Sequence, residues 1–139
     1  MTHEDILYVQ HSWLKVLPRK EAVAALFYRK LFQLDPGLRA LFSDDMEQQG
    51  AKLTQMISAA VRALDRLDML LPVVRELGSR HAGYGVRAEH YGPVGTALLW
   101  TLEQALREQF TPEVKQAWIK TYGVLSQTMR ESALSPAAA

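Results

Sequence analysis

Apolar residues recur three and four positions apart along almost the whole chain, and this spacing is the strongest constraint on its fold. The first such stripe consists of Ile6, Val9, Trp13, Val16 and Leu17. Similar stripes continue into the last helix-like segment, and the alternation typical of β-strands is nowhere sustained. Spacing of this kind places apolar side chains on one face of each helix. The sequence therefore predicts an all-α single domain.

Proline, glycine and capping residues predict where the helices begin and end. Thr2 and Asp5 resemble a capping box, and Pro72 is interpreted as the first residue of its helix. Six or seven helices are expected, with approximate bounds at 2–17, 20–34, 36–42, 47–66 and 72–81, and two more that start near 88 and 112. The domain is expected to span 1–134, and the small residues of 135–139 are expected to form a disordered tail.

Composition and charge exclude several classes of function. Sixteen basic and fifteen acidic residues give a net charge of +1. This balance provides no strong positive electrostatic field to hold nucleic acid or an anionic membrane. The absence of cysteine excludes disulfides, thiolate metal sites and covalent haem attachment. No signal peptide or membrane-spanning run is recognised. We expect a cytoplasmic protein, either a monomer or a weak homodimer.

One histidine of the four occupies a position that amphipathic patterning would give to an apolar residue. His81 shares a helix face with Val74 and Leu77 and is therefore predicted to point inward. Taken alone, a core histidine bonded to backbone is the more ordinary interpretation. One histidine without cysteine cannot build a zinc site, which needs three or four protein ligands. Haem iron needs only one, because the porphyrin supplies four nitrogens.

Two further polar residues lie on apolar helix faces. Gln49 precedes Leu53 and Met56 by four and seven positions, and Tyr28 shares a face with Leu31. An exposed first turn would account for Gln49, and ordinary core packing with the hydroxyl at the rim would account for Tyr28. The functional alternative is a pair of hydrogen-bond donors aimed into a largely apolar pocket. Each ordinary interpretation is the stronger one when its residue is taken singly.

The order of these residues along the chain resembles a known family. Three segments carry the resemblance: Leu26-Phe27-Tyr28-x-x-Leu31-Phe32-x-x-Asp35-Pro36-x-x-x-x-Leu41-Phe42, Arg80-His81-x-x-Tyr84-Gly85-Val86-x-x-x-His90-Tyr91-x-x-Val94-Gly95, and Ala117-Trp118-x-Lys120-x-Tyr122-Gly123-Val124. Together they are similar to bacterial single-domain haemoglobins and to the haem domain of flavohaemoglobins. The resemblance implies a globin fold, a three-over-three helical sandwich around haem b.

The resemblance also assigns roles to individual positions. His81 matches the proximal ligand of the iron, and Tyr28 and Gln49 match the distal pair that stabilises a bound gas. Phe42 matches the aromatic that packs against the porphyrin, and Leu53 limits the space above the iron. Other haem-pocket positions carried over from the family are Tyr91, Val86, Lys52 and Arg80. The last two are candidate partners of the haem propionates, although solvated surface charge is the simpler interpretation of both.

One position departs from the family. Its catalytic members carry a glutamate in the last helix that bonds the proximal histidine, and the matching residue here is Ala133. A carboxylate bonded there makes the imidazole a stronger electron donor to iron. The substitution therefore argues against peroxidase-like or fast dioxygenase chemistry. Glu131 lies nearby on a different helical face, and whether it replaces the glutamate is left open.

Three functions are compatible with these residues. The first is a pentacoordinate haem protein with high affinity for O₂, which also binds NO and CO and serves in oxygen storage or transport. The second is a nitric oxide dioxygenase for nitric oxide detoxification, acting with a separate electron-donating reductase. The reductase is expected to be separate because the chain ends where flavohaemoglobins continue and lacks a G-x-G-x-x-G fingerprint. The third is a globin-fold module without haem.

Overall fold

The computed structural model describes residues 1–133, and all regular elements in that range are helical. This confirms the all-α prediction. The tail expected at 135–139, and with it the domain end expected at 134, lies outside the described residues. The six α-helices of the described range are α1 (His3–Val16), α2 (Lys20–Leu34), α3 (Met46–Arg62), α4 (Leu67–Gly83), α5 (Tyr91–Leu106) and α6 (Pro112–Ala133).

Five short 3₁₀ segments join these helices. They are η1 (Leu17–Arg19), η2 (Pro36–Leu41), η3 (Leu64–Arg66), η4 (Ala88–His90) and η5 (Arg107–Gln109). The predicted capping box is present, since the Asp5 N–H donates to Thr2 Oγ1 at 3.1 Å and the Thr2 N–H donates to Asp5 Oδ2 at 2.9 Å. Side-chain caps of this kind satisfy amide groups that the first helical turn leaves unpaired.

Two predicted boundaries are wrong. Pro72 lies inside α4, which begins at Leu67, and α3 ends at Arg62 rather than near residue 66. A proline at this depth removes one helical hydrogen bond. The side chains of Leu64 and Leu70 are buried in the core on either side of the start of α4. Tertiary packing thus stabilises the first turn of α4, which the helix propensity of the residues before Pro72 would not favour by itself.

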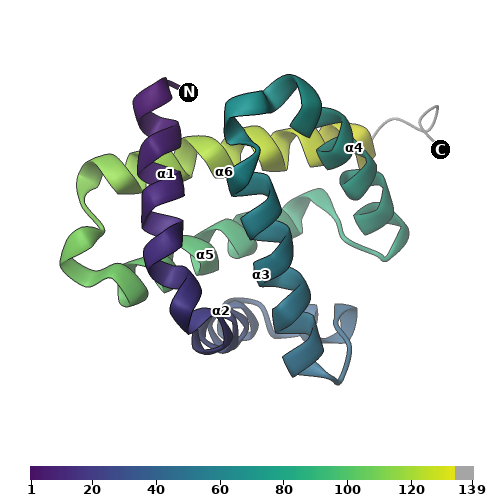
Figure 1. Ribbon diagram of the computed structural model, residues 1–139. Helices are drawn as coiled ribbons and strands as arrows, with labels where there is room; N and C mark the ends of the chain where they lie inside the picture. Colours follow the sequence, from purple (N-terminus) through teal and green to yellow (C-terminus); the bar gives the residue numbers. More distant parts are fainter. Residues whose placement is uncertain (134–139) are drawn as a thin grey trace.

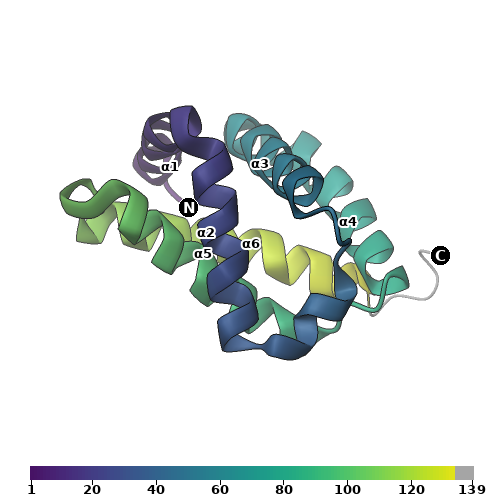
Figure 2. The ribbon, with the colours of Figure 1, turned by 90° about the horizontal axis from the view of Figure 1, so that it is seen from below.

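The helices cross in two layers. In Figure 1, α1 and α3 run in front of α5 and α6, and Figure 2 shows the same two layers from below, with α2 crossing α5 and lying beside α3. The main packing partners are α4 with α6, α2 with α5, α1 with α6 and α2 with α3. The backbones of α3 and α4 do not approach each other as closely as those of these pairs. No helix in the described range is long and apolar enough to cross a membrane.

The core is divided into two clusters. The larger one contains Trp13 and Trp118, whose rings meet edge to face at 6.1 Å between centroids. Their indole N–H groups donate to Ser58 and Ser12, respectively, both at 2.9 Å. The smaller cluster consists of Phe27, Tyr28, Leu31, Leu38 and Ala97. The larger cluster also contains Val61 of α3 and Val74 of α4.

A glycine permits the closest approach of α4 to α6. A Cβ added to Gly78 would lie 2.5 Å from the carbonyl oxygen of Met129 and 2.6 Å from its Cα. Backbone atoms cannot yield as a flexible side chain can, so the two helices would have to separate. The sequence did not identify Gly78 as a contact between helices, because the spacing of apolar residues does not distinguish a packed glycine from an exposed one.

Gly78→Ala is therefore expected to destabilise the protein by about 1–3 kcal/mol, the usual cost of overpacking. The measurement is the free energy of unfolding in urea. Gly92→Ala is the matched control, since Gly92 is also helical and no neighbouring atom lies within 4 Å of its added Cβ. The control should be neutral or slightly stabilising. Equal stabilities of the two variants would contradict the proposed close contact.

Candidate functional site

An apolar cavity of about 180 Å³ lies where α3, α4, α5 and α6 face one another. Three of the residues predicted for the site line it, namely Leu53, His81 and Tyr91. The other lining residues are Phe27, Met56, Ile57, Ala60, Val61, Val74, Leu77, Val94, Leu98, Trp118, Thr121, Tyr122, Leu125, Ser126 and Met129. His81 is the sole histidine of this lining.

The orientation of His81 is fixed by a bond within its own helix. Its Nδ1 lies 2.8 Å from the carbonyl oxygen of Leu77. A carbonyl oxygen can only accept, so Nδ1 carries the proton and donates, and in the neutral ring Nε2 then keeps its lone pair. The half-buried ring is therefore held with one nitrogen able to bind a metal. This is the arrangement typical of metal-binding histidines, whose second nitrogen donates to a backbone carbonyl or carboxylate.

A turn after His81 closes α4 and leads to α5. The N–H groups of Tyr84 and Val86 both donate to the carbonyl oxygen of His81, at 3.0 Å. Gly85 adopts φ = 94° in this turn, a conformation that L residues with a Cβ rarely take. Val86 is half-buried here and does not line the cavity, although it was predicted for the pocket.

Two tyrosines border the same cavity. The Tyr122 hydroxyl donates to the backbone carbonyl oxygen of Tyr91 at 2.5 Å. A Cβ on Gly95 would lie 2.7 Å from the Tyr122 ring, so the glycine makes room for it. Tyr122 belongs to the third segment that resembles the family, but no site role was predicted for it. Periodicity identifies a buried face but does not say whether that face borders a cavity or fills a core.

Tyr28 and Gln49 are brought together, but neither lines the cavity. Tyr28 is buried, and its ring packs against Phe27, Phe32 and Phe42 with centroid distances of 5.1, 5.8 and 5.2 Å. Its hydroxyl donates to the backbone carbonyl oxygen of Gln49 at 3.4 Å. The contact therefore uses the main chain of Gln49, whose half-buried side chain lies in the first turn of α3.

The other predicted residues lie away from the cavity. Phe42 is half-buried between Tyr28 and Phe32. Lys52 is exposed, and Arg80 is exposed with Glu76 at 3.7 Å, a pair typical of a solvated helix surface. The structure thus gathers His81, Leu53 and Tyr91 at one cavity. Tyr28, Gln49 and Phe42 form a separate group, and Tyr28 lines a different pocket, between α2 and α3.

Glu131 does not contact the predicted histidine. Its Oε1 accepts a hydrogen bond from Gln127 Nε2 at 3.0 Å, and the residue is exposed on α6. His81 Nδ1 is bonded instead to the Leu77 carbonyl. The glutamate position that is Ala133 here is therefore not taken over by Glu131.

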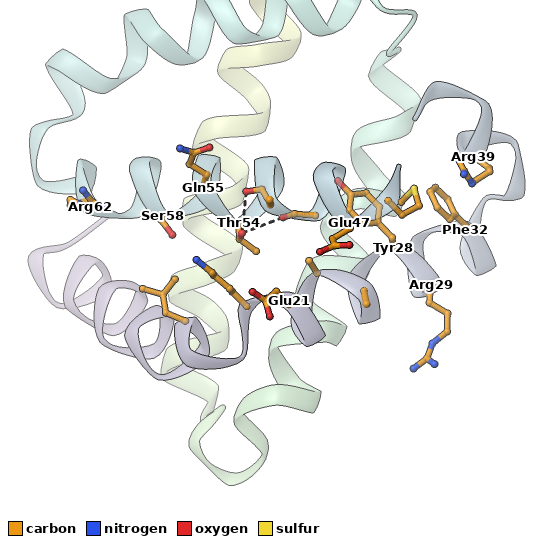
Figure 3. Close-up of a pocket in the computed structure, with 17 residues that line it drawn as sticks. Glu21, Tyr28, Arg29, Phe32, Arg39, Glu47, Thr54, Gln55, Ser58 and Arg62 are labelled. Carbon is orange, nitrogen blue, oxygen red and sulfur yellow. Dashed lines mark hydrogen bonds between the residues drawn. The ribbon is translucent and has the colours of Figure 1, made fainter. Parts of the chain in front are cut away.

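A larger and more open groove of about 1000 Å³ runs along the outside, between α2 and α3 (Figure 3). Ala24 and Gly50 form its floor, where a Cβ on the glycine would lie 3.0 Å from that of the alanine. Thr54 Oγ1 donates to the carbonyl oxygens of Gly50 and Ala51, both at 3.2 Å. Charges of both signs border the groove, and no histidine lines it. In the described part of the chain, no three His, Cys, Asp or Glu side chains gather as a metal site.

Burial makes the phenol groups of the site hard to ionise. It raises the pKa of Tyr28 to about 12 and also raises the pKa values of Tyr91 and Tyr122. The unfolded chain loses these protons near pH 10. The contribution of these tyrosines to the free energy of unfolding is therefore fully present below pH 10. It is expected to fall as the pH rises above 10, because the tyrosines of the unfolded state ionise first.

This prediction is tested by urea unfolding between pH 8 and pH 11.5. Tyr122→Phe should lose less of its stability across that range than the parent chain does. Tyr84→Phe is the control, since Tyr84 is 71% exposed. A pH dependence that is the same in all three proteins would show that Tyr122 does not contribute.

Comparison with known proteins agrees with this architecture. The sequence profile described as Globin matches residues 25–129. A flavohemoprotein of Bordetella parapertussis is 40% identical over 125 residues, which is 86% of this chain and 31% of that protein. A flavohemoprotein of Bacillus subtilis is 33% identical over 109 residues, covering 76% of this chain and 27% of that protein. The chain thus spans about a third of the length of the curated relatives it matches.

Solved structures show the same fold. A Rhodothermus marinus protein, described as an engineered carbene transferase and a candidate nitric oxide dioxygenase, superposes with a TM-score of 0.84 at 27% identity, covering 96% of this chain and 94% of that one. A hexacoordinated haem protein from an anhydrobiotic tardigrade gives a TM-score of 0.87 at 18% identity, covering 97% and 96%. The second likeness concerns the fold alone. The predicted three-over-three helical sandwich is confirmed.

Proposed function

Because this chain belongs to the globin family, we propose that it binds one haem b through His81 Nε2 and holds a diatomic gas, O₂ foremost, on the opposite side. One observation carries the proposal. His81 borders an apolar cavity with its Nδ1–H tied to the Leu77 carbonyl at 2.8 Å, so that the other nitrogen keeps its lone pair. A porphyrin supplies four of the iron ligands, so a single imidazole suffices.

The apolar lining suits the flat face of a porphyrin, but the space must widen. The cavity volume of about 180 Å³ is smaller than the roughly 300–1000 Å³ of typical small-molecule sites. α3 and α4 both line the cavity, and their backbones approach each other less closely than those of the main packing pairs, so widening the cavity requires a shift of these helices and of the side chains between them. Met56 lines the cavity at 38% exposure, and its flexible side chain can move aside.

Haem iron, when bound, supplies an open coordination position for O₂, NO or CO. Tyr28 and Gln49 are proposed to donate uncharged hydrogen bonds to the gas. Tyr28 stays protonated at neutral pH, and its present bond to the Gln49 carbonyl is long at 3.4 Å. A bond of that length is weak, so the hydroxyl is free to exchange it for a better acceptor.

The remaining predicted residues are proposed to shape the pocket. Phe42 would pack on the porphyrin, and Leu53, which already lines the cavity, would limit the room for the gas. Lys52 and Arg80 are exposed, and long cationic side chains at a pocket rim can reach haem propionates at little desolvation cost.

Absorption spectra of the haem-reconstituted protein in its ferric, ferrous and CO-bound forms test the proposal. We expect a Soret band, a five-coordinate ferrous form and a shifted band after CO is added. A protein that gives no Soret band after reconstitution would contradict the proposal and favour a globin-fold module without a cofactor.

Nitric oxide dioxygenase activity is the second candidate, favoured by the similarity to flavohemoproteins and to the Rhodothermus marinus protein. In that reaction NO, O₂ and one electron give nitrate, and we propose that a separate reductase supplies the electron. His81 Nδ1 is hydrogen-bonded to the Leu77 carbonyl and not to a carboxylate. Because a bonded carboxylate would make the imidazole a stronger electron donor to iron, this argues for gas binding rather than for dioxygenase activity. Repeated turnover of NO to nitrate with an added reductase would establish the enzyme, and a single turnover per haem would exclude it.

A further inference from the structure

A single arginine holds the turn that joins η2 to α3. Arg39 Nη1 donates to the carbonyl oxygens of Phe42 and Ser43, both at 3.2 Å. In return, the Phe42 N–H donates to the carbonyl oxygen of Arg39 at 3.2 Å. Both polar groups of the Phe42 backbone are therefore bonded to one residue.

The same guanidinium rests on the aromatic cluster. The Cζ of Arg39 lies 5.6 Å from the centroid of the Phe32 ring, within the range of a cation–π contact. Phe32 in turn packs against Phe42 at 5.6 Å and stacks with Tyr28 at 5.8 Å. Figure 3 shows Arg39 beside Phe32 at one end of the outer groove, with Tyr28 close by. Arg39 thus touches both the backbone of Phe42 and the rings around its side chain.

The turn also sets the start of α3. The Asp45 N–H donates to Ser43 Oγ at 3.0 Å, and Asp45 Oδ1 caps the helix by accepting from the Gln48 N–H at 3.0 Å. Asp44 lies 3.6 Å from Arg39 Nη2, but its side chain is fully exposed, so this ion pair contributes little. The hydrogen bonds from the guanidinium to backbone carbonyls are the stronger, charge-assisted contacts.

We infer that Arg39 is a positioning residue for the haem pocket. By holding the turn 42–45 it fixes Phe42, which packs on the porphyrin, together with the first turn of α3, which carries Gln49. Loss of the guanidinium frees the turn and lets Phe42 move away from the porphyrin. This inference rests on the proposed function, because it concerns residues assigned to haem and gas.

The test compares Arg39→Met with Arg39→Lys and Arg29→Met in the full chain. Methionine keeps the apolar stem and removes every donor, whereas lysine keeps the charge but cannot bridge two carbonyls in a fixed fork. Arg29 is an exposed arginine of α2 that borders the same groove, and its side chain points away from the groove in Figure 3. Arg29→Met therefore controls for the loss of one positive charge.

Two measurements are made. One is the rate at which the ferric protein loses haem to an excess of a haem-free acceptor globin. The other is amide hydrogen exchange of residues 42–48 in the haem-free chain. Arg39→Met should speed both about tenfold or more, as expected for lost hydrogen bonds to a charged group. Arg39→Lys should give an intermediate increase, and Arg29→Met a change of less than about twofold.

The outcomes separate the inference from the proposed function. Unchanged exchange in Arg39→Met overturns the role of Arg39 in holding the turn, whatever the haem does. Faster exchange with unchanged haem loss overturns the positioning role. If the parent chain takes up no haem at all, the proposed function fails and the positioning role with it, while the exchange rates still decide whether Arg39 holds the turn.

Discussion

Replacing His81 with glycine is expected to speed haem loss by more than about a hundredfold, since altering groups that only support a metal ligand already costs about 10–100-fold in affinity. The variant keeps the apolar cavity, because the other lining side chains are unchanged. It removes the sole imidazole of that lining. The Soret band should fall away during gel filtration, and imidazole added to the buffer should restore it by occupying the space that the side chain leaves.

The matched control is His11→Gly, which also places a glycine inside a helix. His11 is exposed on α1 and does not line the cavity. Both variants should lose about 0.5 kcal/mol of helix stability, the difference in propensity between histidine and glycine, so a difference in pigment reports the axial ligand rather than the fold. If His81→Gly kept the parent spectrum without added imidazole, the assignment of His81 would be wrong.

Tyr28→Phe is expected to speed O₂ dissociation at least tenfold. A hydrogen bond to a charged acceptor contributes about 1.5–3 kcal/mol, which corresponds to one to two decades in affinity. Phenylalanine keeps the ring contacts with Phe27, Phe32 and Phe42, so the packing of the smaller core cluster is preserved. The only hydrogen bond lost within the described residues is the weak one to the Gln49 carbonyl.

The dissociation rate is measured by stopped flow, with CO replacing O₂. Tyr8→Phe serves as a control, because Tyr8 lies exposed on α1. Gln49→Leu should give a further increase when it is combined with Tyr28→Phe if both side chains donate to the gas. An off-rate unchanged by Tyr28→Phe would show that another group stabilises bound O₂.

The sequence predicted most of the fold because its local signals agree with the packing. Helical stripes, the Thr2 capping box and the start expected near residue 112 predicted helices that are present. His81 was expected on an inward face with Val74 and Leu77, and all three line the cavity. Pro72 failed as a start signal, since burial of Leu70 extends α4 before it.

The site was harder to predict, for physical reasons. Periodicity does not distinguish a face that fills a core from one that borders a cavity, so Met56, Val94 and Tyr122 were not assigned to the site although they line the cavity. Whether Gln49 uses its amide or its main chain depends on the turn before α3. Arg39 gave no signal in the sequence, because its contacts depend on the path of residues 42–45 rather than on any helical period.

The packing of α4 mainly on one other α-helix has a consequence for how the chain opens. Among the α-helices, α4 packs substantially on α6 alone, and a segment supported on one side opens more readily than the rest of a domain. A ligand that binds only the form in which α4 is packed on α6 opposes this opening. The free energy that it adds grows with the logarithm of its concentration. On the proposed function haem is such a ligand, so its binding would slow the opening of α4 and protect this part of the chain from proteolysis.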